Sequence, residues 1–213
     1  AVAHGIPIRI RSTFNPDCLG TKITEAPGRQ EALVKGISGI DGVALVNLEG
    51  AGMIGVSGTA DRLFGALREE GVSVTLISQG SSEHSICFAV PQESADQVKS
   101  VVEKAFAVEL SQGQVQNVEV TKGCGVLAVV GDGMAGLPGV AGRFFQTLGS
   151  AGINVRAIAQ GASERNISAV IDSKGMTRAL RAVHGSFYLS AKTVSIGLIG
   201  PGSVGGVLLD QMG

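Results

Sequence analysis

The sequence has few charged and aromatic residues and no tryptophan. Charged side chains make up only 16% of its 213 residues, and 17 basic residues stand against 18 acidic ones. Because the chain has no surplus of Lys and Arg with which to neutralise phosphates, we expect no nucleic-acid partner. The same scarcity of charge indicates either an apolar surface that a partner covers or a piece cut from a larger assembly.

Long apolar runs and clustered cysteines are also missing. Gly, Ser or charged residues interrupt every apolar run before the roughly 20 residues that a membrane span needs, so we expect no membrane partner. Cys18, Cys87 and Cys124 are widely spaced and form no metal-ligand pattern with the scattered histidines. We therefore expect no metal, and we interpret these residues as structural thiols in a reducing compartment.

A repeated sequence is the most informative feature that the chain does have. Residues 79–86, QGSSEHSI, return at 160–167 as QGASERNI, with five of the eight positions identical. The same offset of 81 positions, without a gap, gives the pairs Met53 and Met134, Gly58 and Gly139, Phe64 and Phe145, and Phe106 and Phe187. A register kept over more than 50 residues indicates that one structural unit has been duplicated.

Each copy shows the same order of predicted elements. In the first copy, a β-rich run at 43–48 precedes a glycine-rich loop, an amphipathic helix that ends before Gly71, two strands, a second helix and a fourth strand. The later strands are expected at 72–77, 85–90 and 115–120, and those of the second copy at 126–130, 153–159 and 166–171. This β-α-β-β-α-β order is typical of the ferredoxin-like fold.

The repeat therefore predicts an α+β protein with two ferredoxin-like units in tandem, at residues 37–120 and 121–189. One such unit leaves a sheet face and its edge strands bare. We expect the sheets to pair within the chain or between chains, and the second possibility predicts a homo-oligomer.

Residues 1–36 fall outside the repeat. Residues 6–11 alternate like a strand and residues 14–16 resemble a turn, but no core for them is evident nearby. Residues 25–36 are polar and mixed. We interpret the whole segment as the tail of a preceding domain followed by a linker.

Residues 190–213 also fall outside the repeat. Gly200, Gly202 and Gly205 follow an apolar strand in a GxGxxG pattern, which is the fingerprint of a dinucleotide-binding Rossmann fold. The second strand and the acidic ribose ligand of such a fold do not follow in this sequence. We interpret the segment as the truncated start of a Rossmann domain and expect no cofactor to bind to it alone.

The glycine-rich loops are the first candidates for ligand binding. A loop that enters a helix exposes unpaired backbone N–H groups at the positive helix end, which suits a carboxylate, and residues 50–58 and 131–139 both have this form. Gln79 and Gln160 each follow an apolar strand, and their amides can both donate and accept hydrogen bonds. The alternatives are a glycine turn needed for packing alone and glutamines that form a turn.

Three further polar residues are weighed with them. Asn154 is either a ligand residue or a turn residue at the start of a strand. Glu83 and Glu164 are interpreted as surface or loop charges rather than acids. No Ser/His/Asp set, carboxylate pair or nucleophile–base pair emerges, so we expect a binding segment without catalytic residues of its own.

These stretches resemble the paired ACT domains of aspartate kinases, and more closely the regulatory region of bifunctional aspartate kinase–homoserine dehydrogenases. The resemblance rests on residues 52–67, 77–86, 130–134 and 158–168. The ends agree with it, because residues 6–16 are similar to the last strand of the kinase domain and residues 196–205 to the first βα turn of homoserine dehydrogenase.

The resemblance implies a function in feedback inhibition. Full-length members of this family phosphorylate aspartate with ATP, reduce aspartate semialdehyde with NADPH, and are inhibited by threonine. It implies a threonine effector, glutamines of two threonine sites at Gln79 and Gln160, and a location in the cytoplasm, or in the plastid stroma of a plant. The remaining effector-binding residues that it implies are Gly52, Met53, Gly55, Gly58, Ser73, Thr75, Asp132, Asn154 and Val155.

The resemblance also implies that one ACT unit can borrow a strand from the other, so that the boundary near residue 121 is crossed. The kinase and dehydrogenase catalytic residues lie outside this sequence. Three alternatives remain open: an ACT sensor for another amino acid, a structural dimerisation module, and an NAD-dependent oxidoreductase that relies on residues 200–205.

Overall fold

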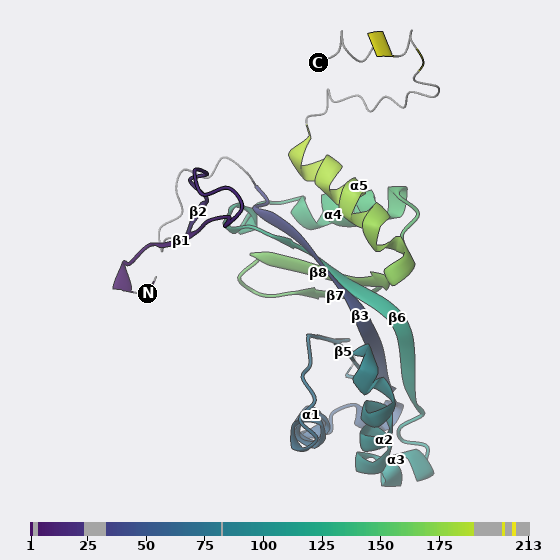
Figure 1. Cartoon of the computed structure of the whole chain (residues 1–213). Coiled ribbons are helices and arrows are strands. Elements are labelled where there is room, and N and C mark those ends of the chain that lie inside the picture. The colour runs from purple at the N-terminus through teal and green to yellow at the C-terminus, as the bar shows by residue number, and fades with distance from the viewer. Residues whose placement is uncertain (2–3, 24–32, 82, 190–201, 203–205, 208–213) are drawn as a thin grey trace.

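The computed structural model describes residue 1 and residues 4–23, 33–81, 83–189, 202 and 206–207. Gly200 and Gly205 of the glycine motif lie outside these residues. The described chain forms two helix-covered halves that are joined by two long strands, which run diagonally through the molecule (Figure 1).

A single antiparallel sheet of six strands, in the order β4-β5-β3-β6-β8-β7, carries both halves. Its two central strands are β3 (Gly36–Glu49) and β6 (Asn117–Val130), each 14 residues long. The strands expected separately at 115–120 and 126–130 are thus one continuous strand. Gly42 and Gly123 have φ values of 71° and 73°, which only glycine adopts easily, and they lie beside the irregular register where β3 and β6 cross.

The remaining elements of each half follow the predicted order. The first half contains η2 (Ala51–Met53), α1 (Thr59–Glu69), β4 (Leu76–Gln79), β5 (Ser85–Pro91), η3 (Gln92–Ser94), α2 (Ala95–Ala105) and α3 (Ala107–Ser111). The second half contains η4 (Asp132–Met134), α4 (Val140–Ser150), β7 (Val155–Gln160), β8 (Asn166–Asp172), η5 (Ser173–Gly175) and α5 (Met176–Tyr188). The α+β fold with two ferredoxin-like units is therefore confirmed, and α3 is an addition that the periodicity did not predict.

The helix ends show why the local prediction succeeded. Gly71 has a φ of 69°, its N–H bonds to Arg68 O, and the next N–H, of Val72, reaches back to Leu67 O. This is the glycine C′ stop that the sequence predicts for the end of α1. Gly152 ends α4 in the same way, with a φ of 67°.

Each half has its own core between sheet and helices. On β3, Ala44, Val46 and Leu48 are fully buried beneath α1 and α2. A separate core in the second half includes Phe144 and Leu148 of α4 and is closed by α5. The two cores stay distinct because each is covered by its own pair of helices.

The third apolar cluster joins the halves. Val43 and Leu45 point to the opposite face of β3, where they meet Val126 of β6 and residues of the other four strands. The sheet curls so that its two helix-free faces pack against each other and its edge strands β4 and β7 lie close together. The bare face expected from the sequence is thus covered within the chain.

The long strand β3 is shared by the two halves. Residues 36–40 of β3 pair with residues 126–130 of β6, at the edge of the second unit, while residues 43–49 form the first strand of the first unit. Val34, just before β3, is only 2% exposed and belongs to the second core. Residues 33–40 therefore pack with the second unit, although the sequence placed them in a linker and at the start of the first unit, and residues 24–32 lie outside the described part of the chain.

The N-terminal segment forms a separate small hairpin. β1 (Ile8–Ile10) pairs with β2 (Thr21–Ile23) in an antiparallel two-stranded sheet, and every residue of both strands is exposed. The strand expected at 6–11 is thus present in shorter form, while its partner was not predicted.

The cysteines of the inter-half cluster should resist alkylation. Burial, and after it the neighbouring Cys124, raises the pKa of the Cys87 thiol to about 11. Burial also raises the pKa of Cys124. Because the thiolate is the reactive form, iodoacetamide at pH 8 should label the exposed Cys18 first and leave Cys87 nearly unmodified until the chain is unfolded in urea.

Peptide mass mapping of the labelled chain would measure these rates. The Cys87 thiol has a lower pKa in the unfolded chain than in the folded chain, so it ionises in the unfolded chain first as the pH rises. The contribution of Cys87 to the free energy of unfolding should therefore be lost between about pH 9 and pH 11. Equal labelling of Cys87 and Cys18 in the folded chain at pH 8 would contradict the buried environment.

Candidate functional site

The loop between β3 and α1 presents backbone donors. Gly55 and Gly58 have φ values of 72° and 87°, so the turn depends on glycine at both positions. Gly58 is the N-cap of α1 and no side chain caps this end. The first N–H groups of α1, at Thr59 and Ala60, therefore have no partner within the helix and face outward at its positive end.

A carboxylate faces this loop from the hairpin between β4 and β5. Glu83 has a φ of 57°, and its side chain accepts a hydrogen bond from the Gly55 N–H at 3.0 Å. The second copy repeats the arrangement, with Glu164 at a φ of 55° and its carboxylate on the Gly136 N–H. Within the described residues these are the only non-glycine residues with positive φ, a sparsely populated conformation that occurs in turns and recurs at ligand-binding sites.

The sequence indicated surface or loop charges for both glutamates, and it did not predict their contact with the glycine loops. They are exposed, but each carboxylate is tied to a loop amide. Their recurrence at the same offset of 81 positions is the signal that could have found them.

The loop and the hairpin enclose a cavity of about 310 Å³. It is lined by Met53, Gly55, Val56, Ser57, Gly58, Thr59, Ala60, Gln79, Glu83 and Ile86. Its size falls in the range of small-molecule sites. The cavity combines the positive end of a helix, one carboxylate and one side-chain amide, a set of groups that matches the charges of a zwitterion.

Four of the predicted residues meet in this cavity: Met53, Gly55, Gly58 and Gln79. Gly52 does not line it, because its N–H donates to Gln114 O at 2.9 Å and its Cα lies close against the Gln114 side chain. The amide of Gly52 is therefore committed to holding the loop against the segment before β6.

The two predicted glutamines lie on a second, larger cavity. It has a volume of about 620 Å³, runs between the edge strands β4 and β7, and is lined by Gln79, Gln160 and Thr75 among others. Its remaining polar residues carry hydroxyl or amide groups: Ser78, Ser163, Asn166 and Ser168. Gln79 thus lines both cavities, a proximity that follows from the curl of the sheet.

The second glycine loop differs from the first in its charge. Asp132 pairs with Lys35 at 3.2 Å and with Arg165 at 3.4 Å, whereas Ala51 stands at the corresponding position of the first loop. Lys35 comes from the segment that the second unit borrows. The structure thus places Asp132 in an ion-pair network that ties this segment to the loop.

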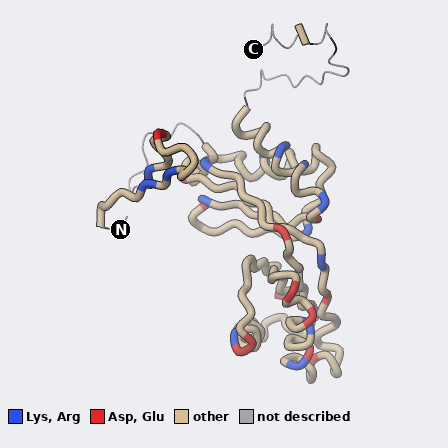
Figure 2. Tube along the Cα trace, viewed as in Figure 1, with Lys and Arg blue, Asp and Glu red and all other residues tan. Residues whose placement is uncertain are grey.

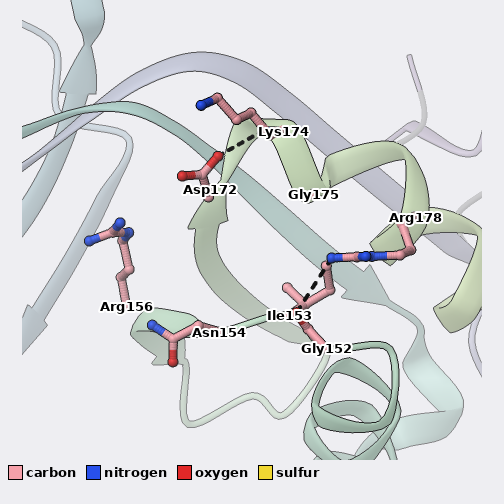
Figure 3. A pocket seen from close by; sticks show the side chains of 8 residues that line it. All are labelled: Gly152, Ile153, Asn154, Arg156, Asp172, Lys174, Gly175 and Arg178. Carbon is pink, nitrogen blue, oxygen red and sulfur yellow. Dashed lines mark hydrogen bonds between the residues drawn. The ribbon is translucent and has the colours of Figure 1, made fainter.

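The last three predicted residues lie apart from these cavities. Asn154 lines a third cavity with Gly152 and Arg156 (Figure 3). Ser73 is exposed before β4, and Val155 begins β7. In the described part of the chain no three His, Cys, Asp or Glu side chains are grouped to hold a metal ion, and no helix is long and apolar enough to cross a membrane.

Two ferredoxin-like units with glycine loops at equivalent helix starts define a pair of ACT modules. The ACT domain family matches residues 46–106 and 127–187 separately, and the chain belongs to this family. Each match covers one helix-and-sheet half of the structure.

Two relatives show which kind of ACT protein this chain resembles. The chain is 48% identical to the chloroplastic bifunctional aspartokinase/homoserine dehydrogenase 1 of Arabidopsis thaliana, with 98% of this chain and 24% of that protein covered. It is 44% identical to the bifunctional aspartokinase/homoserine dehydrogenase of Haemophilus influenzae, with 98% and 26% covered. The resemblance to the regulatory region of these enzymes is thereby confirmed, and the chain spans about a quarter of their length.

Solved structures agree on the fold. The ligand-free regulatory subunit of aspartate kinase from Thermus thermophilus has a TM-score of 0.60 at 29% identity, and 73% of this chain and 99% of that one are covered. Aspartokinase III of E. coli in complex with lysine and aspartate has a TM-score of 0.69 at 23% identity, with 88% and 40% covered, a likeness in fold alone.

Proposed function

We propose that this chain is an effector-binding segment that holds a free amino acid in the cavity between the β3–α1 loop and the β4–β5 hairpin. The observation that carries the proposal is the charge arrangement of that cavity. The uncapped start of α1 offers N–H groups to the effector carboxylate, and Glu83 offers its carboxylate to the ammonium group.

Threonine is the effector that we propose. Gln79 can donate and accept hydrogen bonds, which suits the threonine hydroxyl, and Met53 and Ile86 give the site an apolar base for its methyl group. Lysine, which is bound in the E. coli aspartokinase III complex, would place a second ammonium group in a cavity that has one carboxylate.

The effector cannot simply take the Gly55 amide, because the Glu83 carboxylate already accepts from it. The N–H groups of Thr59 and Ala60 are the remaining donors on the cavity wall. Glu83 held in this way is oriented before the ligand arrives, which reduces the entropy that binding would cost.

The proposed role of binding is regulation of a longer enzyme. The names of the relatives support aspartokinase and homoserine dehydrogenase activities for the parent chain. ATP and NADPH are its proposed nucleotides, and its catalytic residues are proposed to lie outside this segment. An effector bound in one half can bias the packing of the two halves, since β3 and β6 serve both, and such couplings typically amount to about 1–3 kcal/mol. The plastid is the proposed location in a plant, following the chloroplastic relative.

A homo-oligomer is also part of the proposal. The edge strands β4 and β7 leave Ile77 and Ile158 49% and 45% accessible, although both side chains also line the cavity between the halves. Edge strands with exposed apolar side chains favour pairing with another chain.

Calorimetric titration with threonine tests the site. Gln79→Ala should weaken threonine binding about tenfold, because it removes an amide that lines the binding cavity. Gln160→Ala should weaken threonine binding less, because Gln160 lines the cavity between the halves but not the cavity beside the glycine loop. Gln112→Ala, which removes an exposed amide elsewhere, is the matched control and should leave affinity unchanged.

A thermal-shift screen of the twenty amino acids accompanies the titration. A larger thermal shift with lysine than with threonine would mean that lysine is the effector, while the proposed cavity would remain the binding site. Unchanged threonine affinity in both Gln79→Ala and Gln160→Ala would remove the glutamine assignment, and no response to any amino acid would favour a purely structural module.

A further inference from the structure

The two halves carry opposite net charge. Residues 43–116 contain nine acidic and four basic side chains, whereas residues 124–189 contain three acidic and six basic ones. In Figure 2 the acidic residues gather around the half with α1 and α2, and basic residues predominate in the half with α4 and α5. The second half therefore has a positive field of its own, although the whole chain has a net charge of −1.

Three of these basic residues surround one cavity. A cavity of about 450 Å³ at the start of β7 and α5 is lined by Arg156, Lys174 and Arg178, with Asp172 as its single acidic residue. Figure 3 shows Arg156 from β7 and Arg178 from α5 on opposite sides of this space, with the Arg178 side chain reaching across toward Gly152. Gly175, the N-cap of α5, also lines it, so the positive end of this 13-residue helix adds to the field.

The carboxylate on this wall is partly engaged. Asp172 Oδ1 accepts the backbone N–H of Lys174 at 2.9 Å, and the Arg178 guanidinium makes a weak contact of 3.4 Å with Gly152 O. None of the three cations takes part in the ion pairs formed among the described residues. The cavity therefore holds a surplus of two positive charges that the chain itself leaves unbalanced.

The duplication shows that this charge is specific to one half. At the offset of 81 positions, Arg156, Lys174 and Arg178 correspond to Thr75, Glu93 and Gln97 in the first half. The fold does not require basic residues at these positions, because the first half forms the same elements without them. The basic set is thus an added feature of the second half.

We propose that this cavity is an anion site for the phosphate group of a small molecule, separate from the amino-acid site. A phosphoryl group carries about 1.5–2 negative charges at pH 7, which matches the surplus. Two guanidinium groups can each make paired hydrogen bonds to phosphate oxygens, and Lys174 adds a point charge. The first half has Glu93 at the position equivalent to Lys174, so it has no comparable surplus of positive charge there.

Titration of the 213-residue chain with inorganic phosphate and pyrophosphate at constant ionic strength tests the proposal. Amide shifts of Gly152 and Gly175 in NMR spectra should report binding, and pyrophosphate should bind more tightly. Arg156→Gln and Arg178→Gln should each weaken binding about tenfold. Arg181→Gln is the matched control, because it removes an exposed charge from α5 outside the cavity and should change affinity little.

Several results would overturn the site. Equal weakening by Arg181→Gln would show that only the general field of the second half is measured. Equal binding of malonate would remove the preference for phosphate. Absence of any shift at Gly152 and Gly175 up to millimolar pyrophosphate would remove the cavity as a site, and circular dichroism of each variant confirms that the chain is folded.

Discussion

A chain that begins at residue 43 should lose the folded second half. It lacks Gly36–Ile40, which pair with β6, and Val34, which is buried in the second core. The burial lost with Val34 and the adjacent apolar residues indicates a destabilisation of about 3 kcal/mol or more. Hydrogen exchange should show β8 and α5 exchanging faster in this chain, while α1 and β5, whose partner residues 43–49 remain, keep more of their protection.

A chain that begins at residue 33 is the matched control. It lacks the β1–β2 hairpin but keeps Val34 and all of β3. Among the described strands the two hairpin strands pair only with each other, so urea denaturation should give nearly the same midpoint as the full chain. Equal stability of the chains that begin at 33 and 43 would contradict the strand exchange.

Phe88→Ala should destabilise the chain by about 3–5 kcal/mol. Phe88 lies on β5 at 0% exposure, in edge-to-face contact with Phe64 at a centroid distance of 5.9 Å. Its removal leaves a cavity in the first core, because the strands and helices around it are fixed by their own pairing. Far-UV circular dichroism in urea measures the change.

The control for this substitution is Phe14→Ala. Phe14 is 99% exposed, so the same loss of an aromatic ring should leave the denaturation midpoint within error. A loss below about 1 kcal/mol for Phe88→Ala would mean that the first core is much looser than the contacts of Phe88 indicate.

The second half should respond to Phe88→Ala as well. Val46 of β3 packs in the first core, and its neighbour Leu45 packs against the strands of the second half. Because β3 contributes side chains both to the first core and to the cluster that joins the halves, a shift of β3 in the first core also moves its residues in that cluster. This continuity is the physical basis for transmitting an effector signal in the proposed function.

The amino-acid sequence by itself determined the repeat, the element types and the ACT fold. Helical spacing of apolar residues and the C′ glycine at Gly71 act over a few neighbouring residues, so they can be recognised along the chain. The same holds for the glycine loops, because Gly55 and Gly58 need backbone angles that other residues avoid. Gln79 could be singled out as well, since its surroundings recur in the second copy.

Only the tertiary structure decided which residues meet. Residues 36–40 pair with residues about 90 positions away, a contact that local sequence patterns do not specify. Glu83 is an ordinary exposed glutamate in the sequence, and its contact with Gly55 exists only because the hairpin folds over the loop. Gln79 and Gln160 share a cavity because the sheet curls, and this curl results from packing among six strands rather than from the residues of any one of them.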